Sequence, residues 1–315
     1  AEKLSSMVGV EPRSIFVSNG ATEAIQAVVQ NFSSHVHINV PTFSPYYEFA
    51  GSEHRVTRFQ LDPTENFVVN PQRYVDSVLK SGADTAVLIS PNNPDGYLIP
   101  DSELNWILSK LSDLSTVIVD ESFIHFASRD TVDSSYAGVD SALPTLVGIT
   151  EQFENVTVIK SMSKDFGIAG IRAGYAIMNP SRVDRLLDHG YLWNISGIAE
   201  YFFSLFNRSI FLHEYRDILN TYLKYIERFT SMTSRINFLQ AYPTDANFQL
   251  IQMPLGVSSD VFTSLMLIRH GIYVRSCKDK IGLDGEFLRV AIRTEPENVE
   301  ITDALSDVLG STGHI

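Results

Sequence analysis

Short apolar runs alternate with amphipathic stretches along the first two thirds of the chain. The apolar runs are rich in β-branched residues, which predicts buried strands. They cover residues 14–18, 35–40, 54–59, 84–90, 116–119, 156–159 and 173–178. The stretches between them carry apolar residues three and four apart, as the core-facing side of a helix does. They predict a helix end at 1–9 and helices from about residue 21 and at 44–50, 71–80, 101–113 and 181–189, with Asp101 capping the helix at 101–113.

The regular alternation of strand and helix predicts the fold class. The strands are almost continuously apolar, as strands covered on both faces are. Parallel strands need long crossover connections, and the predicted helices supply them. We therefore expect an α/β protein whose mostly parallel, doubly wound sheet lies between helices.

The pattern changes after residue 190. A long tract with helical spacing begins at Trp193 and continues to about Ile236. Shorter elements follow it, with strands predicted at 247–252, 272–276 and 287–293 and helices at 258–270 and 296–309. We expect a large domain over residues 1–205 and a smaller C-terminal α+β domain over residues 206–315.

Composition narrows the classes of function. The chain has 315 residues, of which 44% are hydrophobic, enough for a substantial core. Its net charge of −13, without a block of like charges, argues against binding to nucleic acid or to an anionic membrane surface. The single cysteine, Cys277, excludes an internal disulfide and a cysteine-based zinc site, and we expect no metal. Without a membrane-spanning run or a signal peptide, the sequence predicts a cytoplasmic protein.

One lysine lies in a loop rich in serine and glycine, directly after the predicted strand at 156–159. An ammonium that is buried or crowded by other cations loses proton affinity, and the neutral amine can then form a Schiff base with an aldehyde. Ser161 and Ser163 precede Lys164, and Arg172 follows it beyond a glycine-rich turn. This set suits an aldehyde cofactor that carries a phosphate. The alternative is a surface loop with two ordinary cations.

Two other strand ends carry residues suited to such a cofactor. After the strand at 14–18, Gly20, Ala21 and Thr22 form a small-residue turn into a helix, whose free N–H groups attract a phosphate. After the strand at 35–40, Phe43 is placed to stack on a planar ring. The alternatives are a generic glycine turn and a core aromatic residue.

Two more strands end in polar side chains. Asn93 lies in a turn held by two prolines, where its amide could donate to a phenolic oxygen. Asp120 closes a very apolar strand, and a buried carboxylate there is costly unless a cation such as a protonated ring nitrogen meets it. A plain turn, a helix cap or an internal salt bridge are the alternatives. Ligands of open α/β sheets bind at this carboxyl edge of the strands, where all these candidates lie.

Arginines mark the predicted strands of the small domain. Arg275 and Arg289 lie on neighbouring strands, where a guanidinium suits a carboxylate or a phosphate. Arg293 follows Arg289 at an even spacing on one predicted strand, which puts both on one face. A shared cationic patch and ordinary surface arginines are both compatible with this pattern.

In sequence order, these motifs resemble one family. They are SNGATEAI, PTFSPY, SPNNPDG, VDESF, SMSKDFGIAGIRAGY, TDANFQL, GIYVR and LRVAIRTEPEN. The chain resembles the fold-type I pyridoxal phosphate (PLP) enzymes of aminotransferase class I/II, in the branch of histidinol-phosphate aminotransferase and threonine-phosphate decarboxylase. The resemblance covers essentially the whole chain. It implies the PLP-transferase fold, with a seven-stranded sheet in the large domain, and a homodimer.

The resemblance also implies roles for the candidate residues. Lys164 would form the Schiff base and move protons, and Asp120 would pair with the pyridinium nitrogen. The other roles are stacking by Phe43, a hydrogen bond from Asn93 to the phenolic oxygen, and phosphate binding by the Ala21 and Thr22 amides after Gly20, by Ser161, by Ser163 and by Arg172. Arg289 would receive the substrate carboxylate or help to hold a substrate phosphate, with Arg275 as the second cation.

Two features depart from the family pattern. Phe123 stands where the family carries a tyrosine that donates to the phenolic oxygen. Loss of that donor should raise the proton affinity of the Schiff base, because the anionic oxygen is no longer favoured. The chain also begins at Ala1 without the family's N-terminal segment, so we expect a trimmed chain or a further N-terminal segment or domain.

Three functions follow from the resemblance. The leading expectation is an aminotransferase that moves an amino group from a small amino acid or amine bearing phosphate, phosphonate or another anionic group to a 2-keto acid or aldehyde. The alternative is a PLP-dependent decarboxylase of an O-phospho-amino acid, which Phe123 favours. The third is a non-catalytic PLP-binding regulatory domain. The first two reactions differ in which bond to the α carbon breaks.

Overall fold

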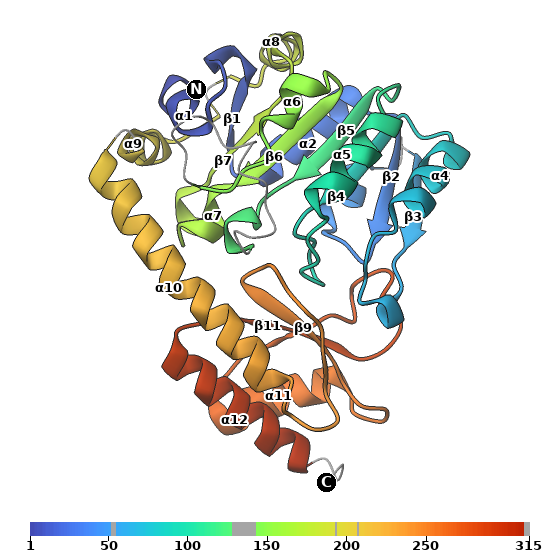
Figure 1. Cartoon of the computed structure of the whole chain (residues 1–315), viewed down its shortest axis with the longest axis vertical. Coiled ribbons are helices and arrows are strands. Elements are labelled where there is room, and N and C mark those ends of the chain that lie inside the picture. Colours follow the sequence, from blue (N-terminus) through green and yellow to red (C-terminus); the bar gives the residue numbers. More distant parts are fainter. Residues whose placement is uncertain (52–54, 128–142, 193, 207, 312–315) are drawn as a thin grey trace.

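A seven-stranded sheet forms the centre of the larger part of the molecule (Figure 1). The computed structural model describes residues 1–51, 55–127, 143–192, 194–206 and 208–311. The strands lie in the order β1-β7-β6-β5-β4-β2-β3. Their bounds are β1 (Ile15–Asn19), β2 (His35–Val40), β3 (Arg55–Gln60), β4 (Thr85–Ile89), β5 (Thr116–Asp120), β6 (Val156–Ser161) and β7 (Ala173–Ile177). Only β7 runs antiparallel to its neighbours, β1 and β6, so the prediction of a mostly parallel sheet is confirmed.

Helices cover both faces of this sheet because its strands are apolar on both sides. On β5, Val117 and Val119 belong to one apolar cluster and Ile118 to the other, and all three are buried. Full burial of one such side chain contributes about 1.5–3 kcal/mol. The first cluster packs under α1 (Glu2–Val8), α4 (Pro71–Ser81), α5 (Asp101–Lys110), α6 (Ile149–Gln152) and α9 (Gly197–Leu205). The second packs under α2 (Ala21–Phe32), α3 (Pro45–Glu48) and α8 (Pro180–Asp188).

A smaller antiparallel sheet lies beyond the carboxyl edge of the large one (Figure 1). Its order is β10-β11-β9-β8, with β8 (Gln240–Ala241), β9 (Phe248–Gln252), β10 (Arg275–Ser276) and β11 (Phe287–Ala291). The helices α11 (Ser259–His270) and α12 (Glu295–Ser311) complete this part with its own apolar core. The long helix α10 (Ser209–Thr233) extends from the large sheet to this smaller part, so the two parts share an element.

Several element boundaries differ from the prediction. The strand predicted at 156–159 continues to Ser161, because Lys160 and Ser161 pair with β7. The helical tract predicted from Trp193, which lies outside the described residues, is divided into α9 and α10. Asp101 is the first residue of α5 and does not cap it, since the cap position is Pro100. His54, the predicted start of β3, is also outside the described residues.

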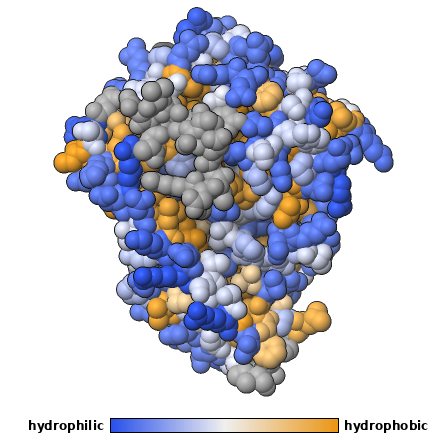
Figure 2. Space-filling model, viewed as in Figure 1, coloured by the Kyte–Doolittle hydropathy of each residue, from blue (hydrophilic) through white to orange (hydrophobic). Residues whose placement is uncertain are grey.

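The face of the molecule seen in Figure 2 is mostly hydrophilic, with scattered apolar side chains. Such scattered exposure is normal for a folded protein. Within the described ranges, no helix combines the length and the apolar character that crossing a bilayer requires.

Candidate active site

A pocket of about 510 Å³ lies between the carboxyl edge of the large sheet and the small sheet. The sequence-predicted site residues line it, except for Gly20, which forms the turn beside it. They are Ala21, Thr22, Phe43, Asn93, Asp120, Phe123, Ser161, Ser163, Lys164, Arg172, Arg275 and Arg289. In the described part of the chain, no group of three or more His, Cys, Asp or Glu side chains gathers as metal ligands.

The turn before α2 is shaped to receive an anion. Gly20 has a φ of 78° and caps α2, whose first N–H groups have no partners within the helix. The Arg172 guanidinium passes directly over this glycine, so a Cβ on Gly20 would lie 2.4 Å from Arg172 Nη2. Arg172 is held there by hydrogen bonds of 3.1 and 3.4 Å to the backbone oxygens of Ala169 and Asn19. Helix terminus and guanidinium together form a cationic cradle for a phosphate.

Two serines face the same cradle. The Ser163 amide donates to Ser161 Oγ at 3.3 Å. Within the described residues, Ser163 Oγ is buried and has no hydrogen-bond partner. Buried hydroxyl groups are nearly always paired, so an orphaned one beside a cationic cradle fits a phosphate oxygen as its missing partner. The residues present therefore fit the phosphate of PLP.

Lys164 opens onto the pocket from the short helix α7 (Met162–Asp165). Partial burial lowers the pKa of its ammonium, and the positive charges of Arg289 and Arg172 lower it further. The neutral amine that attacks an aldehyde is therefore more abundant than on an exposed lysine. This is the property that the sequence pattern predicted for Lys164.

Asp120 ends β5 with its carboxylate buried in the pocket wall. Tyr46 Oη donates to Asp120 Oδ2 at 2.8 Å, and the Ser122 amide donates to Oδ1 at 2.9 Å. Burial nevertheless raises the pKa of Asp120, because these two donors and the more distant Lys160 only partly compensate the lost solvation. A protonated ring nitrogen beside this carboxylate would stabilise its charged form.

Asn93 and the arginines meet on the opposite side of the pocket. Arg289 Nη1 donates to Asn93 Oδ1 at 2.7 Å, which leaves the amide nitrogen of Asn93 as its donor toward a ring oxygen. Arg275 lies opposite Arg289 in the antiparallel pair β10/β11 and contacts Asp279 at 2.6 Å. Two guanidinium groups thus border one pocket, enough to meet two anionic groups of a substrate.

The structure corrects the prediction for Arg293. Strand β11 ends at Ala291, so Arg293 lies beyond it and does not share the face of Arg289. Its guanidinium contacts Glu297 at 3.0 Å at the start of α12 instead. The even spacing gave a wrong prediction for Arg293, because the alternation of faces holds only as far as the strand continues.

Some pocket residues were not anticipated from the sequence. Tyr46 belongs to the same motif as Phe43, and only the fold places its hydroxyl on Asp120. Phe248 packs edge-on against Phe123, with ring centroids 5.1 Å apart, and lies under the Arg289 guanidinium. Tyr273 lines the pocket from the segment before β10. The available signal was its place in the strand predicted at 272–276, two residues before Arg275.

Comparisons with known proteins agree with this geometry. The family described as aminotransferase class I and II matches residues 1–305. An L-serine phosphate decarboxylase of Campylobacter jejuni is 44% identical over 309 residues, covering 98% of this chain and 77% of the relative. An L-serine phosphate decarboxylase of Sulfurospirillum multivorans is 39% identical, covering 97% of this chain and 76% of that protein.

Solved structures give the same relationship. A decarboxylase from Sulfurospirillum multivorans superposes with a TM-score of 0.90 at 39% identity, covering 98% of this chain and 85% of that chain. The histidinol-phosphate aminotransferase of Clostridium acetobutylicum superposes with a TM-score of 0.85 at 25% identity, covering 98% and 88%. The expected PLP-transferase fold is confirmed.

These relatives correct the expected reaction. The sequence motifs favoured an aminotransferase, and this expectation is wrong, because the relatives with 44% and 39% identity are decarboxylases. Histidinol-phosphate aminotransferases match at 28%. Phe123 favoured the decarboxylase alternative, and the other motifs left both reactions open. The chain belongs to the class I and II aminotransferase family, in the PLP-dependent branch that holds histidinol-phosphate aminotransferases and phospho-amino-acid decarboxylases.

Proposed function

We propose that this chain is a PLP-dependent decarboxylase of an O-phospho-amino acid, with L-serine phosphate as the first candidate substrate. The observation that carries the proposal is the 44% identity over 98% of the chain to an L-serine phosphate decarboxylase. The pocket supports it with two arginines, Arg275 and Arg289, since this substrate carries two anionic groups besides its amine. We also propose that the chain acts as a homodimer and that domains 1–205 and 206–315 enclose the site.

The bound cofactor supplies an aldehyde for the substrate amine and a ring that withdraws electrons from the α carbon. We assign its phosphate to the cradle of Arg172, Ser161, Ser163 and the first amides of α2. Asp120 holds the proton on the ring nitrogen, which keeps the ring electron-poor. Asn93 donates to the ring oxygen, and Phe43 packs on the ring face.

Lys164 has two tasks in this proposal. The Lys164 amine would hold the cofactor through its aldehyde, and once the substrate amine has taken that place the Lys164 ammonium would carry a proton. The C–COO⁻ bond breaks, CO₂ leaves, and the electron pair stays at the α carbon. Lys164 delivers a proton to that carbon, so one substrate and one proton yield CO₂ and an amine that still carries the phosphate. No keto acid is needed.

Arg289 and Arg275 orient the substrate. Arg289 is fixed by Asn93, so an anionic group bound to it has a defined direction relative to the ring. The bound cofactor would accept electrons from one bond of the α carbon, so the orientation that the arginines give the substrate would select which bond breaks. We propose that one guanidinium binds the substrate phosphate and the other binds the carboxylate, so that the two anionic groups together fix the orientation of the α carbon in the pocket.

The experiment is a substrate assay without any keto acid. Purified protein with PLP is given L-serine phosphate, and both CO₂ and the phosphorylated amine are quantified. We expect equimolar products, and little turnover of unphosphorylated L-serine, which cannot use the second guanidinium. Consumption that requires a keto acid acceptor and releases no CO₂ would refute the proposal.

A further inference from the structure

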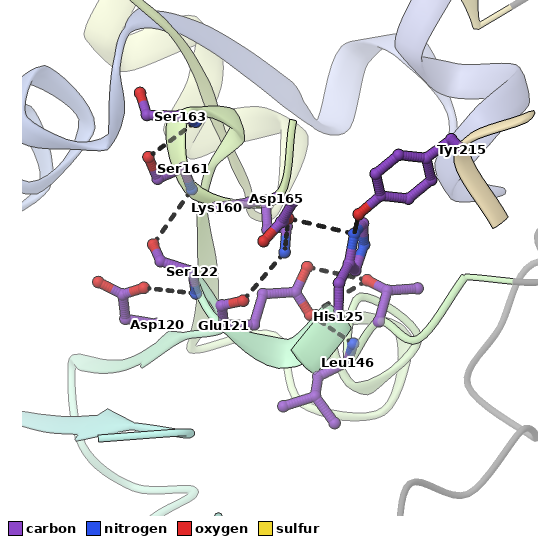
Figure 3. A network of polar contacts seen from close by, with 11 residues as sticks. Asp120, Glu121, Ser122, His125, Leu146, Lys160, Ser161, Ser163, Asp165 and Tyr215 are labelled. Atoms are coloured by element: carbon purple, nitrogen blue, oxygen red, sulfur yellow. Dashed lines mark hydrogen bonds and ion pairs between the residues drawn. The ribbon is translucent and has the colours of Figure 1, made fainter. Parts of the chain in front are cut away.

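In three pairs of residues that are adjacent in sequence, one residue lines the pocket and the other belongs to a buried polar cluster beneath it. Asp120, Ser161 and Lys164 line the pocket. Their sequence neighbours form the cluster together with His125 and Tyr215. The Asp120 carboxylate points away from His125, Tyr215 and Asp165 (Figure 3). The neighbours are Glu121, Lys160 and Asp165. Successive residues of a strand point to opposite faces, which explains the division of Lys160 and Ser161 on β6.

An ion pair forms the centre of this cluster. Lys160 Nζ lies 2.5 Å from Asp165 Oδ2, and their side chains are 1% and 0% exposed. Lys160 Nζ also donates to the backbone oxygen of Glu121 at 3.2 Å. The Glu121 carboxylate accepts from Thr145 Oγ1 at 2.9 Å and from the Leu146 amide at 2.6 Å. One lysine thus joins the end of β5 to the residue that follows Lys164.

A second set of contacts joins the same turn to helix α10. His125 Nδ1 lies 3.2 Å from Asp165 Oδ2 and is hydrogen-bonded to Tyr215 Oη at 2.8 Å, so the imidazole stands between the α7 turn and α10. Burial and the charge of Lys160 lower the pKa of His125 well below its usual range, so the ring is neutral. Phe166 stacks on Tyr215, with ring centroids 4.3 Å apart. The turn that carries Lys164 is therefore held on two sides.

The α7 turn depends on these contacts because it has only four residues. A helix of one turn has no stability of its own, so tertiary contacts set its position. Lys164 and Asp165 are adjacent in this turn, and the Asp165 carboxylate cannot leave Lys160 without stranding two buried charges. The backbone of Lys164 therefore has one favoured position. Stability alone does not require an ion pair here, because apolar side chains of similar volume are often equally stabilising.

We propose that the Lys160–Asp165 ion pair, with its contacts to His125 and Tyr215, positions Lys164 for capture of the cofactor aldehyde. Lys160 and Asp165 are positioning residues that act through the turn. The proposal rests on the role of Lys164 as the cofactor lysine. It does not rest on the decarboxylation reaction, and its test needs no substrate, so the two proposals fail separately.

The test measures cofactor capture by the full chain. Protein freed of cofactor is mixed with PLP alone, and the absorbance band of the lysine-bound cofactor gives the rate constant of capture. Borohydride reduction and mass analysis of the Lys164 peptide confirm the attachment. In the Lys160→Met/Asp165→Leu double variant no buried charge is stranded, and we expect capture to slow by ~10- to ~100-fold, the scale of a misplacement near 1 Å. Capture at the unmodified rate would overturn the proposal.

A single substitution keeps the test decisive if the double variant does not fold. Asp165→Asn preserves the shape of the side chain and removes its charge, and we expect slower capture in the same direction, by on the order of 10-fold. A folded Asp165→Asn variant that captures PLP at the unmodified rate would also overturn the proposal. Lys164→Ala should show no band, and a band in that variant would remove the assignment on which the proposal rests.

The chain offers a matched control for general loss of stability. Thr233 is fully buried in α10, and its hydroxyl donates to Gln249 at 2.7 Å, in the small-sheet part. Thr233→Val removes a buried hydrogen bond without touching the cluster, at a cost of about 1–3 kcal/mol. We expect the rate of capture to stay within about twofold of the unmodified rate, because a loss of stability at Thr233 leaves the α7 turn in place. An equal slowing in this control would show that capture follows stability, and would overturn positioning.

Discussion

The two sides of the β5 and β6 strand ends carry the same kinds of side chain and use them differently. On the pocket side, Lys164 opens onto the pocket and Ser163 Oγ has no partner among the described residues. On the buried side, Lys160 and Asp165 contact each other and are closed to solvent. The comparison teaches that chemistry alone does not assign a role. Lys164 faces a pocket that can hold a ligand, whereas Lys160 is closed in by the Asp165 carboxylate and the Glu121 backbone oxygen.

Substitution of the pocket lysine gives the largest expected effect. Lys164→Ala should lower CO₂ release from L-serine phosphate by at least ~10³-fold, because both cofactor attachment and proton delivery are lost. The unfolding free energy of the cofactor-free protein should change by less than about 1 kcal/mol, since the side chain makes no buried ion pair. Product analysis and urea denaturation measure the two quantities. Substantial residual turnover, or a large loss of stability, would contradict this side of the comparison.

Substitution of the buried lysine should cost far more stability than Lys164→Ala does. Lys160→Met strands the Asp165 carboxylate, and we expect a loss of about 3–5 kcal/mol in unfolding free energy. Adding Asp165→Leu removes the stranded charge and should recover most of that loss. Urea denaturation of the two single variants and the double variant gives the coupling energy. If the double variant is no more stable than Lys160→Met, the two side chains do not act as a pair.

A residue on the buried side, Glu121, should also make the unfolding free energy depend on pH. Burial raises the pKa of Glu121 from 4.5 to about 7, although Lys160, Leu146 and Thr145 oppose the shift. The folded state therefore holds a proton that the unfolded state releases, so this contribution is complete below pH 4.5 and is lost as the pH rises toward 7. Each pKa unit corresponds to about 1.4 kcal/mol. The side chain in Glu121→Gln stays neutral at every pH. The unfolding free energy of this variant should therefore rise relative to that of the unmodified protein as the pH increases from 4.5 to 7.

The measurement for Glu121 is urea denaturation at several pH values between 4 and 8, on the unmodified protein and on Glu121→Gln. The difference between the two curves reports Glu121 together with its coupling to Asp165, whose pKa burial raises to about 6. Glu297→Gln is a suitable control, because Glu297 is exposed and its lowered pKa of about 2 places its titration below this range. A difference curve that is flat for Glu121→Gln would show that Glu121 does not hold a proton in the folded state.

Much of the pocket side could be predicted from the sequence, and the buried side could not. Lys164, Asp120 and Asn93 follow apolar strands, and the carboxyl ends of such strands gather at one edge, so their meeting was predictable. Lys160 was missed because its strand was predicted to end at residue 159. A lysine inside a buried strand demands an anion, and this was the available signal. Its partner Asp165 is five residues away, and only the turn of α7 brings the two together.

The reaction could not be predicted for a different reason. The motifs left both reactions open because the two reactions differ only in which bond to the α carbon breaks. Under the proposed function, that choice depends on how Arg275 and Arg289 hold the substrate, and Arg289 is itself held by Asn93. Sequence motifs report which residues are present, whereas this orientation depends on their relative directions within the pocket.

The smallest expected effect concerns Phe123, a pocket residue without a polar atom. Phe123 is buried edge-on against Phe248, so it fills space where a tyrosine would add a donor. Phe123→Tyr should lower the pH midpoint of the bound cofactor's absorbance band by up to about one unit, since one hydrogen bond contributes about 1 kcal/mol. Phe126→Tyr is the matched control, because Phe126 is buried nearby against Tyr222 and does not line the pocket. Equal midpoints in the two variants would show that a hydroxyl at position 123 does not reach the ring oxygen, and that packing against Phe248 is the whole role of this residue.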